Sequence, residues 1–212
     1  MYQRQLDALI AFASGERFQP ELLEARERYF GATGEIFEDD KSFELRMASF
    51  LDYYVFDWKL SESGKSPAQL FLEESSEPSA DELQTLRGLT ETTHSLWEVR
   101  KLAAELVRVR DVFTGKDMDV FERRQPAGLK KGDLIEARLV PCDGRLLFSS
   151  AFCFHPEEMR KAILKEVKRL KKHEPEFDRL AFIWALSRMR LKLERYRNIS
   201  PDQIYAFGRK TI

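Results

Sequence analysis

The sequence predicts an α+β protein in which a five-stranded antiparallel small barrel, SH3-like or OB-like, lies between helical segments. Apolar residues first recur with the helical period of 3.6 and then, after His94, with the period of two that is typical of strands. The helical period returns after Pro156, where basic residues accumulate. We therefore predict a helical segment at 1–94, a barrel at 95–155 and basic C-terminal helices at 156–212, with the option that all three pack as one unit.

The clearest signal in the first segment is a helix whose apolar residues, from Phe43 to Trp58, follow the helical period closely. Asp40 is its predicted N-cap. Ser66, which precedes a proline, marks another helix start, and Ser79 with a glutamate three residues later has the spacing of a capping box. Two further helices are expected at 2–14 and from Pro20 to about Gly31.

The barrel is expected from five short strands, at 96–102, 106–111, 118–122, 134–140 and 146–154. The Asp143-Gly144 pair between the last two strands is a strong signal for a tight hairpin. Five short antiparallel strands favour a small closed barrel, because closure removes exposed edges. The strand pattern leaves the SH3-like and OB-like topologies open. Two long helices are expected after the barrel, at 156–172 and 177–197.

Composition limits the class of protein more than its function. With 43% hydrophobic residues among 212, the chain can bury a substantial core. Its longest apolar runs are far shorter than the roughly 20 residues of a membrane span, and the N-terminus lacks the apolar centre of a signal peptide. The two cysteines, Cys142 and Cys153, are too few for a disulfide framework, so we predict a reducing, cytoplasmic location.

Charge is divided along the chain. From Pro156 to the end there are 15 Lys or Arg against 8 Asp or Glu, a net charge of +7 within a total of −1. Such asymmetry bears on binding partners rather than on the fold. The basic helices either present a binding surface or are neutralised by the acidic remainder of the chain.

Two segments resemble a loosely defined group of uncharacterised bacterial proteins. One is the aromatic helix end at 50–58, and the other runs from Val109 to Lys116 and continues at 132–141. Some members of that group also carry a cysteine-rich SEC-C zinc motif, which this sequence lacks. The resemblance spans about residues 43–155, and it implies the order of elements but no activity.

No catalytic set, cofactor motif or metal motif is predicted. Cys153 and His155 are two residues apart on a predicted strand, so their side chains can share a face as a thiolate–imidazole pair or as half of a metal site. Because no second Cys/His cluster completes a zinc site, the favoured interpretation is a small buried cysteine and a histidine at a helix start. The acidic stretch from Glu35 to Asp40 lacks the spacing of a calcium loop and is interpreted as a solvated loop.

The predicted binding surface lies on the two C-terminal helices. Lysines lie opposite the apolar stripe of the first helix, so they should face solvent and can contact a partner or phosphates. The complete set of predicted binding cations is Lys161, Lys165, Lys168, Arg169, Lys172, Arg188, Lys192 and Arg195.

Aromatic residues pose a choice between core and docking surface. Tyr53, Tyr54 and Trp58 cover much of one helix, so they are either buried or form an aromatic docking edge, and burial is favoured. The barrel phenylalanines, such as Phe148, are likewise interpreted as core rather than as a base-stacking platform.

By elimination, we expect a non-enzymatic binding or adaptor protein that acts through a protein–protein surface, with its oligomeric state open. The alternative is a nucleic-acid-binding protein that uses the basic helices and the barrel, although a sequence pI of about 6.4 is low for that class.

Overall fold

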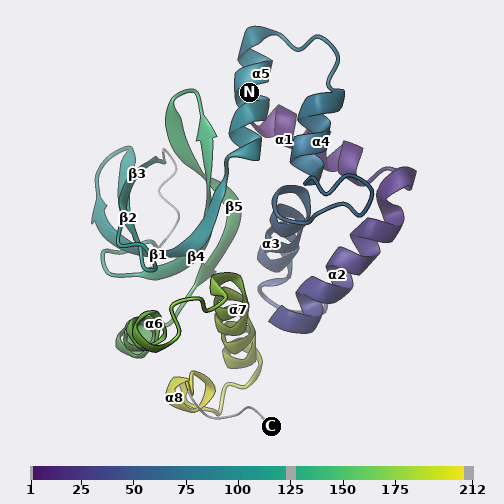
Figure 1. Cartoon of the computed structure of the whole chain (residues 1–212). Helices are drawn as coiled ribbons and strands as arrows, with labels where there is room; N and C mark the ends of the chain where they lie inside the picture. Colours follow the sequence, from purple (N-terminus) through teal and green to yellow (C-terminus); the bar gives the residue numbers. More distant parts are fainter. Residues whose placement is uncertain (1, 123–127, 208–212) are drawn as a thin grey trace.

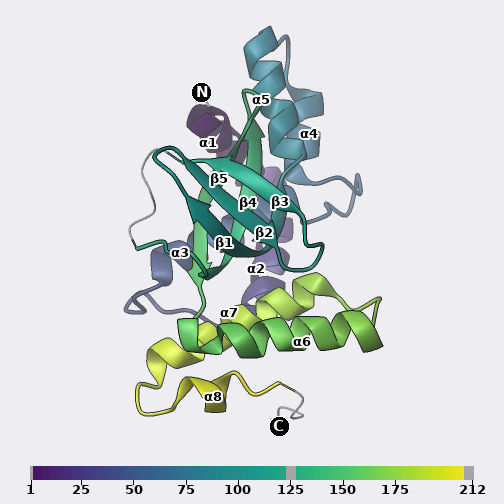
Figure 2. The same ribbon diagram turned by 90° about the vertical axis from the view of Figure 1, so that its left-hand side faces the viewer.

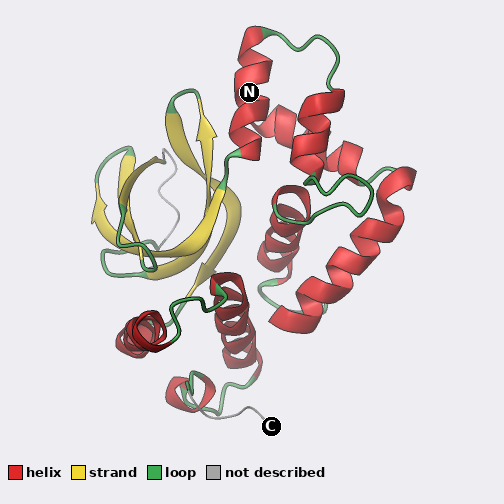
Figure 3. Cartoon of the chain, viewed as in Figure 1, coloured by secondary structure: helices red, strands yellow, loops and turns green. Residues whose placement is uncertain are grey.

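The computed structural model describes residues 2–122 and 128–207, and Figure 1 shows the arrangement of their helices and strands. The helices are α1 (Tyr2–Ala13), α2 (Gln19–Thr33), α3 (Phe43–Phe56), α4 (Pro67–Glu74), α5 (Ala80–Thr90), α6 (Arg160–His173), α7 (Arg179–Arg195) and the short α8 (Pro201–Ile204). The strands are β1 (Thr93–Leu102), β2 (Leu106–Asp111), β3 (Asp117–Phe121), β4 (Leu134–Cys142) and β5 (Arg145–Phe154). The α+β class with a helical N-terminal part is therefore confirmed, and Figure 3 shows the helices beside the sheet and below it.

Local capping explains where the N-terminal helices begin. Both capping boxes are present, with the Ser66 and Ser79 side chains accepting hydrogen bonds from the N–H groups three residues later. The prediction that Asp40 caps α3 is wrong, because Ser42 takes that position. The Asp40 carboxylate instead accepts the backbone N–H of Phe37 at 2.8 Å and pairs with Arg195, so this side chain is already engaged.

The five strands hydrogen-bond in the order β1-β2-β3-β5-β4, and β4 also pairs with β1, so the sheet closes on itself. The prediction that every pairing is antiparallel is wrong at one junction, since β3 and β5 run parallel where Val120 pairs with Leu146. Asp143 and Gly144 form the predicted tight hairpin between β4 and β5 with φ angles of 50° and 70°.

Side chains alternate between the two faces of β4, and both faces are buried. Ile135, Ala137 and Leu139 point into the barrel, where they pack with residues of the other strands. Val140 packs outward against the N-terminal helices, and Leu134 packs outward against the C-terminal helices. The outer face of β4 is therefore covered by helices and does not face solvent.

The N-terminal helices pack against the outside of β4 and β5 (Figure 1). At the closest point a Cβ on Gly88 of α5 would lie 2.0 Å from the Pro141 carbonyl oxygen, so only glycine permits this approach. The C-terminal helices α6, α7 and α8 lie together below the barrel in Figure 2, around a core that includes Ile163, Val167 and Leu186. Among the described residues, no helix combines the length and hydropathy that a membrane crossing requires.

Candidate functional site

The outer face of β4 carries charged side chains beneath the helices. Glu136 is 4% exposed and Arg138 is 2% exposed, although both alternate with barrel-core residues. Strand pairing sets Arg138 opposite His94 on β1 and sets Glu136 opposite Cys153 on β5. Buried ionised groups are costly unless they are paired, so the partners of these two side chains define the site.

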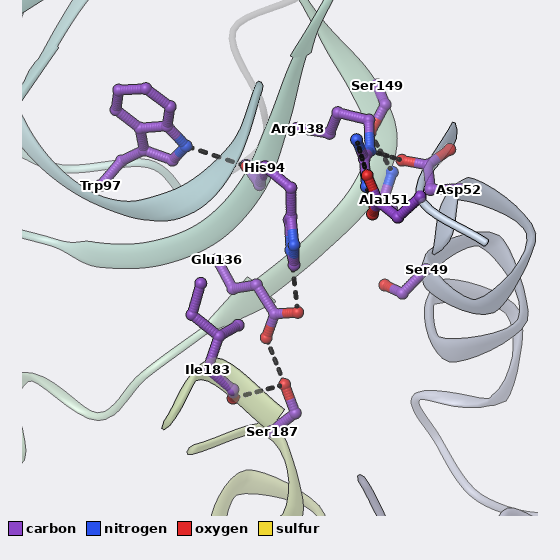
Figure 4. Close-up of polar contacts among 12 residues, drawn as sticks. Ser49, Asp52, His94, Trp97, Glu136, Arg138, Ser149, Ala151, Ile183 and Ser187 are labelled. Atoms are coloured by element: carbon purple, nitrogen blue, oxygen red, sulfur yellow. Dashed lines mark hydrogen bonds and ion pairs between the residues drawn. The ribbon is translucent and has the colours of Figure 1, made fainter. Parts of the chain in front are cut away.

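Glu136 is held from two directions, as Figure 4 shows. The His94 Nε2 atom lies 3.2 Å from one carboxylate oxygen, and the Ser187 hydroxyl of α7 donates to the other oxygen. Burial alone raises the pKa of Glu136, but the hydrogen bonds from His94 and Ser187 hold it below its ordinary value. Glu136 therefore joins β1, β4 and α7 as a buried carboxylate.

Arg138 joins the barrel to α3. Its guanidinium donates to both carboxylate oxygens of Asp57 and, at 2.8 Å, to the Thr92 hydroxyl. The ring of Phe56 lies 5.0 Å from the guanidinium carbon, in cation–π geometry. Asp52 approaches the Arg138 Nε atom at 3.8 Å without a hydrogen bond, and burial raises the pKa of Asp52.

The Glu136 carboxylate also belongs to a second cluster. Its carboxylate oxygen, the Cys153 sulfur and a ring nitrogen of His155 all lie within 4.8 Å of one another. Burial raises the pKa of the Cys153 thiol and lowers the pKa of His155 to about 4. Spacing in the sequence pairs Cys153 with His155, but Glu136 comes beside them only through the strand register.

The predicted basic surface is divided by the structure. Four of the predicted α6 cations are exposed and form no ion pair with another described residue. They are Lys161, Lys165, Lys168 and Lys172. Arg169 of the same helix is neutralised by Glu166 and Glu174, each at 3.0 Å or closer. Arg195 pairs with Asp40 of the acidic stretch, so part of the charge asymmetry is satisfied within the chain.

Arg188 and Lys192 lie elsewhere, on an exposed side of α7. They line a groove of about 820 Å³ between α7 and α8 whose other described lining residues are mainly apolar. Tyr196, 55% exposed, and Ile199, 39% exposed, also line the groove. Neither Arg188 nor Lys192 forms an ion pair with a carboxylate in the described ranges.

The exposed face of β2 and β3 is also charged but internally balanced. Arg108 makes two hydrogen bonds of 2.7 Å to Asp119, and Arg110 contacts Asp117 in the same bidentate manner. These arginines are thus already occupied by carboxylates. They offer little charge to an oligonucleotide backbone.

The aromatic docking hypothesis for α3 is wrong. Tyr53, Tyr54 and Trp58 are 6%, 0% and 8% exposed, and the Tyr53 ring packs against Tyr29 of α2 and Trp184 of α7. The Tyr54 hydroxyl donates to the Ala13 carbonyl oxygen at 2.9 Å, as a buried phenol requires. Phe148 is buried inside the barrel, so its interpretation as core is confirmed.

A second surface cavity, of about 800 Å³, lies at one end of the barrel. It is bounded by the β1–β2 turn, which includes Glu105, and by the β4–β5 turn at Gly144. Phe121 and Arg145 line it together, with the guanidinium 4.2 Å from the ring centre.

Comparison with known proteins identifies a family without an assigned activity. Residues 21–191 match the model of the Family of unknown function (DUF7986), and the chain belongs to this family. This agrees with the resemblance to uncharacterised proteins. No curated protein and no solved structure matches the chain.

Proposed function

We propose that this family member is a non-enzymatic binding protein that docks an acidic, amphipathic segment of another protein in the groove between α7 and α8. The observation that carries the proposal is the combination, in one groove, of an apolar lining with Arg188 and Lys192. An amphipathic helix that enters such a groove buries its apolar side there and leaves its polar side at the rim. The volume of about 820 Å³ is within the range of ligand-binding clefts.

Charge favours an acidic partner. Arg169 and Arg195 are neutralised within the chain, whereas Arg188 and Lys192 remain available at the groove. Positive charge at the rim accelerates association with an acidic segment and disfavours a basic one. Tyr196 adds an amphipathic ring of the kind that is enriched where proteins bind each other.

The composition of the groove favours binding over catalysis. Its described lining contains cations, one phenol, one glutamine and apolar side chains, but no carboxylate, histidine or thiol. This part of the structure therefore offers no Ser–His, Cys–His or paired-carboxylate set for catalysis.

The proposal is tested with a fluorescent, designed acidic amphipathic helical peptide and its charge-reversed counterpart. We expect the acidic peptide to bind the wild-type chain, and the Arg188→Glu/Lys192→Glu variant to bind it at least about tenfold more weakly. The matched control is Lys161→Glu/Lys165→Glu, which makes the same charge change on α6 and should leave the affinity nearly unchanged. An equal loss in both double variants, or equal affinity for the two peptides, would contradict docking in the groove.

A second candidate function rests on the barrel. We infer an OB-like rather than an SH3-like barrel, which the order β1-β2-β3-β5-β4 and the parallel β3–β5 pairing support. OB folds bind oligonucleotides beside the β1–β2 and β4–β5 loops, where this chain has its cavity with Phe121 and Arg145. An aromatic ring beside an arginine suits base stacking and phosphate contact.

This alternative predicts binding of single-stranded DNA or RNA that weakens steeply with salt. Phe121→Ala should then reduce the affinity, whereas the Arg188→Glu/Lys192→Glu variant should retain it. Absence of oligonucleotide binding at low salt removes the alternative and leaves peptide docking as the proposed function. Under either function we infer a cytoplasmic location, which the two free cysteines support.

A further inference from the structure

The cluster of Glu136, Cys153 and His155 is built by the backbone of the barrel. Glu136 and Cys153 are directly opposite each other in the β4–β5 pairing, and His155 follows Cys153 by two residues. His155 is held by a hydrogen bond from its backbone N–H to the Leu134 carbonyl oxygen at 3.0 Å. Since neighbouring strands and a two-residue spacing both place side chains on one face, all three converge without any loop.

The three donor atoms match the ligands that zinc takes in proteins. Zinc binds cysteine sulfur at about 2.3 Å, and histidine nitrogen and carboxylate oxygen at about 2.0–2.2 Å. Ligand atoms around one tetrahedral ion are then about 3.3–3.7 Å apart. The atoms of this cluster lie within 4.8 Å of one another, so rotamer adjustments that close them by roughly 1 Å suffice.

His155 provides a second, independent observation that points to a ligand. This side chain is only 6% exposed, yet its Nε2 atom has no hydrogen-bond partner. Its Nδ1 atom lies 3.2 Å from the Tyr205 hydroxyl, which can accept the Nδ1 proton. Metal-binding histidines commonly donate their second ring N–H to such an orienting group, which leaves the other nitrogen for the ion.

The surroundings of the cluster accommodate a divalent cation. Glu136 already contacts His94 and Ser187, but a carboxylate has about four acceptor positions and retains capacity for a metal. The carboxylate and a Cys153 thiolate together balance the charge of a divalent ion. A cavity of about 90 Å³ adjoins Glu136 and Cys153 and has room for a water molecule as fourth ligand.

Arg46 and Arg190 line the same cavity. The Arg190 Nε atom is held by the Phe154 carbonyl oxygen at 2.9 Å, and Arg46 is held by the Thr33 and Gly34 carbonyl oxygens. Their positions are therefore fixed by the backbone. They do not compete for the three ligand atoms through hydrogen bonds to them.

We propose that Glu136, Cys153 and His155 bind one Zn²⁺ ion, with water from the adjoining cavity as the fourth ligand. Binding releases the Cys153 thiol proton to solvent, because the thiolate is the form that coordinates the metal. The Tyr205 hydroxyl acts as a positioning group for His155. This site is separate from the proposed groove between α7 and α8, so either proposal can fail without the other.

The test uses Co²⁺ as a spectroscopic probe, followed by displacement with Zn²⁺. The wild-type chain should bind one equivalent of Co²⁺ with intense near-ultraviolet absorption from the cobalt–thiolate bond, and Zn²⁺ should abolish that absorption. Cys153→Ser should lose the absorption. Tyr205→Phe should keep it with an affinity about 10–100-fold lower, as expected when an orienting partner is removed.

Cys142→Ser is the matched control, because Cys142 is the other cysteine of the chain and lies outside the cluster. This variant should bind Co²⁺ like the wild type. If Cys153→Ser fails to fold, alkylation of the wild-type chain replaces it, and Zn²⁺ should slow modification of Cys153 but not of Cys142. Absence of cobalt–thiolate absorption in the wild type, its loss in Cys142→Ser, or alkylation of Cys153 that Zn²⁺ does not slow would overturn the proposal.

Discussion

The barrel carries arginine–carboxylate pairs on two faces that differ in their exposure to water. On β2 and β3 the side chains of the Arg108–Asp119 pair are 51% and 46% exposed, whereas Arg138, under α3, is 2% exposed. Exposed pairs are screened by water and lose side-chain entropy when they form, so they stabilise a fold very little. A buried charge must keep its partner, because an uncompensated ion in the interior is costly. Similar residue types therefore add little stability on one face and link the barrel to α3 on the other.

The largest effect is expected from Arg138→Ala. This change leaves the buried Asp52 of α3 without its cation and removes the ion pair that links the barrel to Asp57 at the end of α3. We expect a loss of about 3–5 kcal/mol in the free energy of unfolding, measured by urea denaturation. A loss of unfolding free energy as small as that expected for a surface pair would show that water reaches the β4–α3 junction. The pairs on the two faces would then contribute equally to stability.

The two carboxylates beside Arg138 should contribute differently to the free energy of unfolding. Asp57 receives two hydrogen bonds from the guanidinium, so Asp57→Asn should cost about 1–3 kcal/mol in urea denaturation. Asp52 makes only a 3.8 Å contact with Arg138. Asp52→Asn should therefore reduce the free energy of unfolding by less than Asp57→Asn does. The reverse order would mean that Asp52 is the principal partner of Arg138.

The stability of the Asp52→Asn variant should also depend on pH in a defined direction. Burial raises the folded-state pKa of Asp52 above 3.8, so as pH rises the unfolded chain releases this proton first. The wild type thus loses stability between pH 3.8 and the raised pKa, and Asp52→Asn removes that loss. Relative to the wild type, the variant should become more stable as pH increases through this window. A constant difference in unfolding free energy across the window would contradict the assignment.

The smallest effect is expected on the exposed face. Arg108→Ala removes the bidentate contact with Asp119, but both side chains are surrounded by water. The urea midpoint should therefore remain within experimental error of the wild-type value. A clear loss of stability would indicate that the β2–β3 face is covered in solution, for example by another copy of the chain.

Much of the fold could be predicted because its signals are local. The apolar periods, the capping boxes at Ser66 and Ser79, and the Asp143-Gly144 hairpin each depend on a few neighbouring residues. The cap at Asp40 failed because the carboxylate is engaged by Arg195, which lies 155 residues away in the sequence. The parallel β3–β5 pairing depends on the path of the whole sheet, which strand propensity does not determine.

The buried cluster was harder to predict because it depends on an irregularity in strand register. If the pairing of Cys142 with Arg145 continued without interruption along the hairpin, Ala151 would lie opposite Glu136. A shift between Ala137 and Leu139 instead brings Cys153 opposite Glu136. Long-range packing of the helices covers the outer face of β4, which the strand pattern alone does not determine.

Binding in the groove between α7 and α8 is tested most directly by amide hydrogen exchange of the chain with and without the acidic amphipathic peptide. We predict slower exchange across α7 and α8, around Arg188, Lys192 and Ile204, with no change in α6 or in β2 and β3. Protection confined to the lysine face of α6, or to the barrel end at Phe121 and Arg145, would contradict docking in the groove.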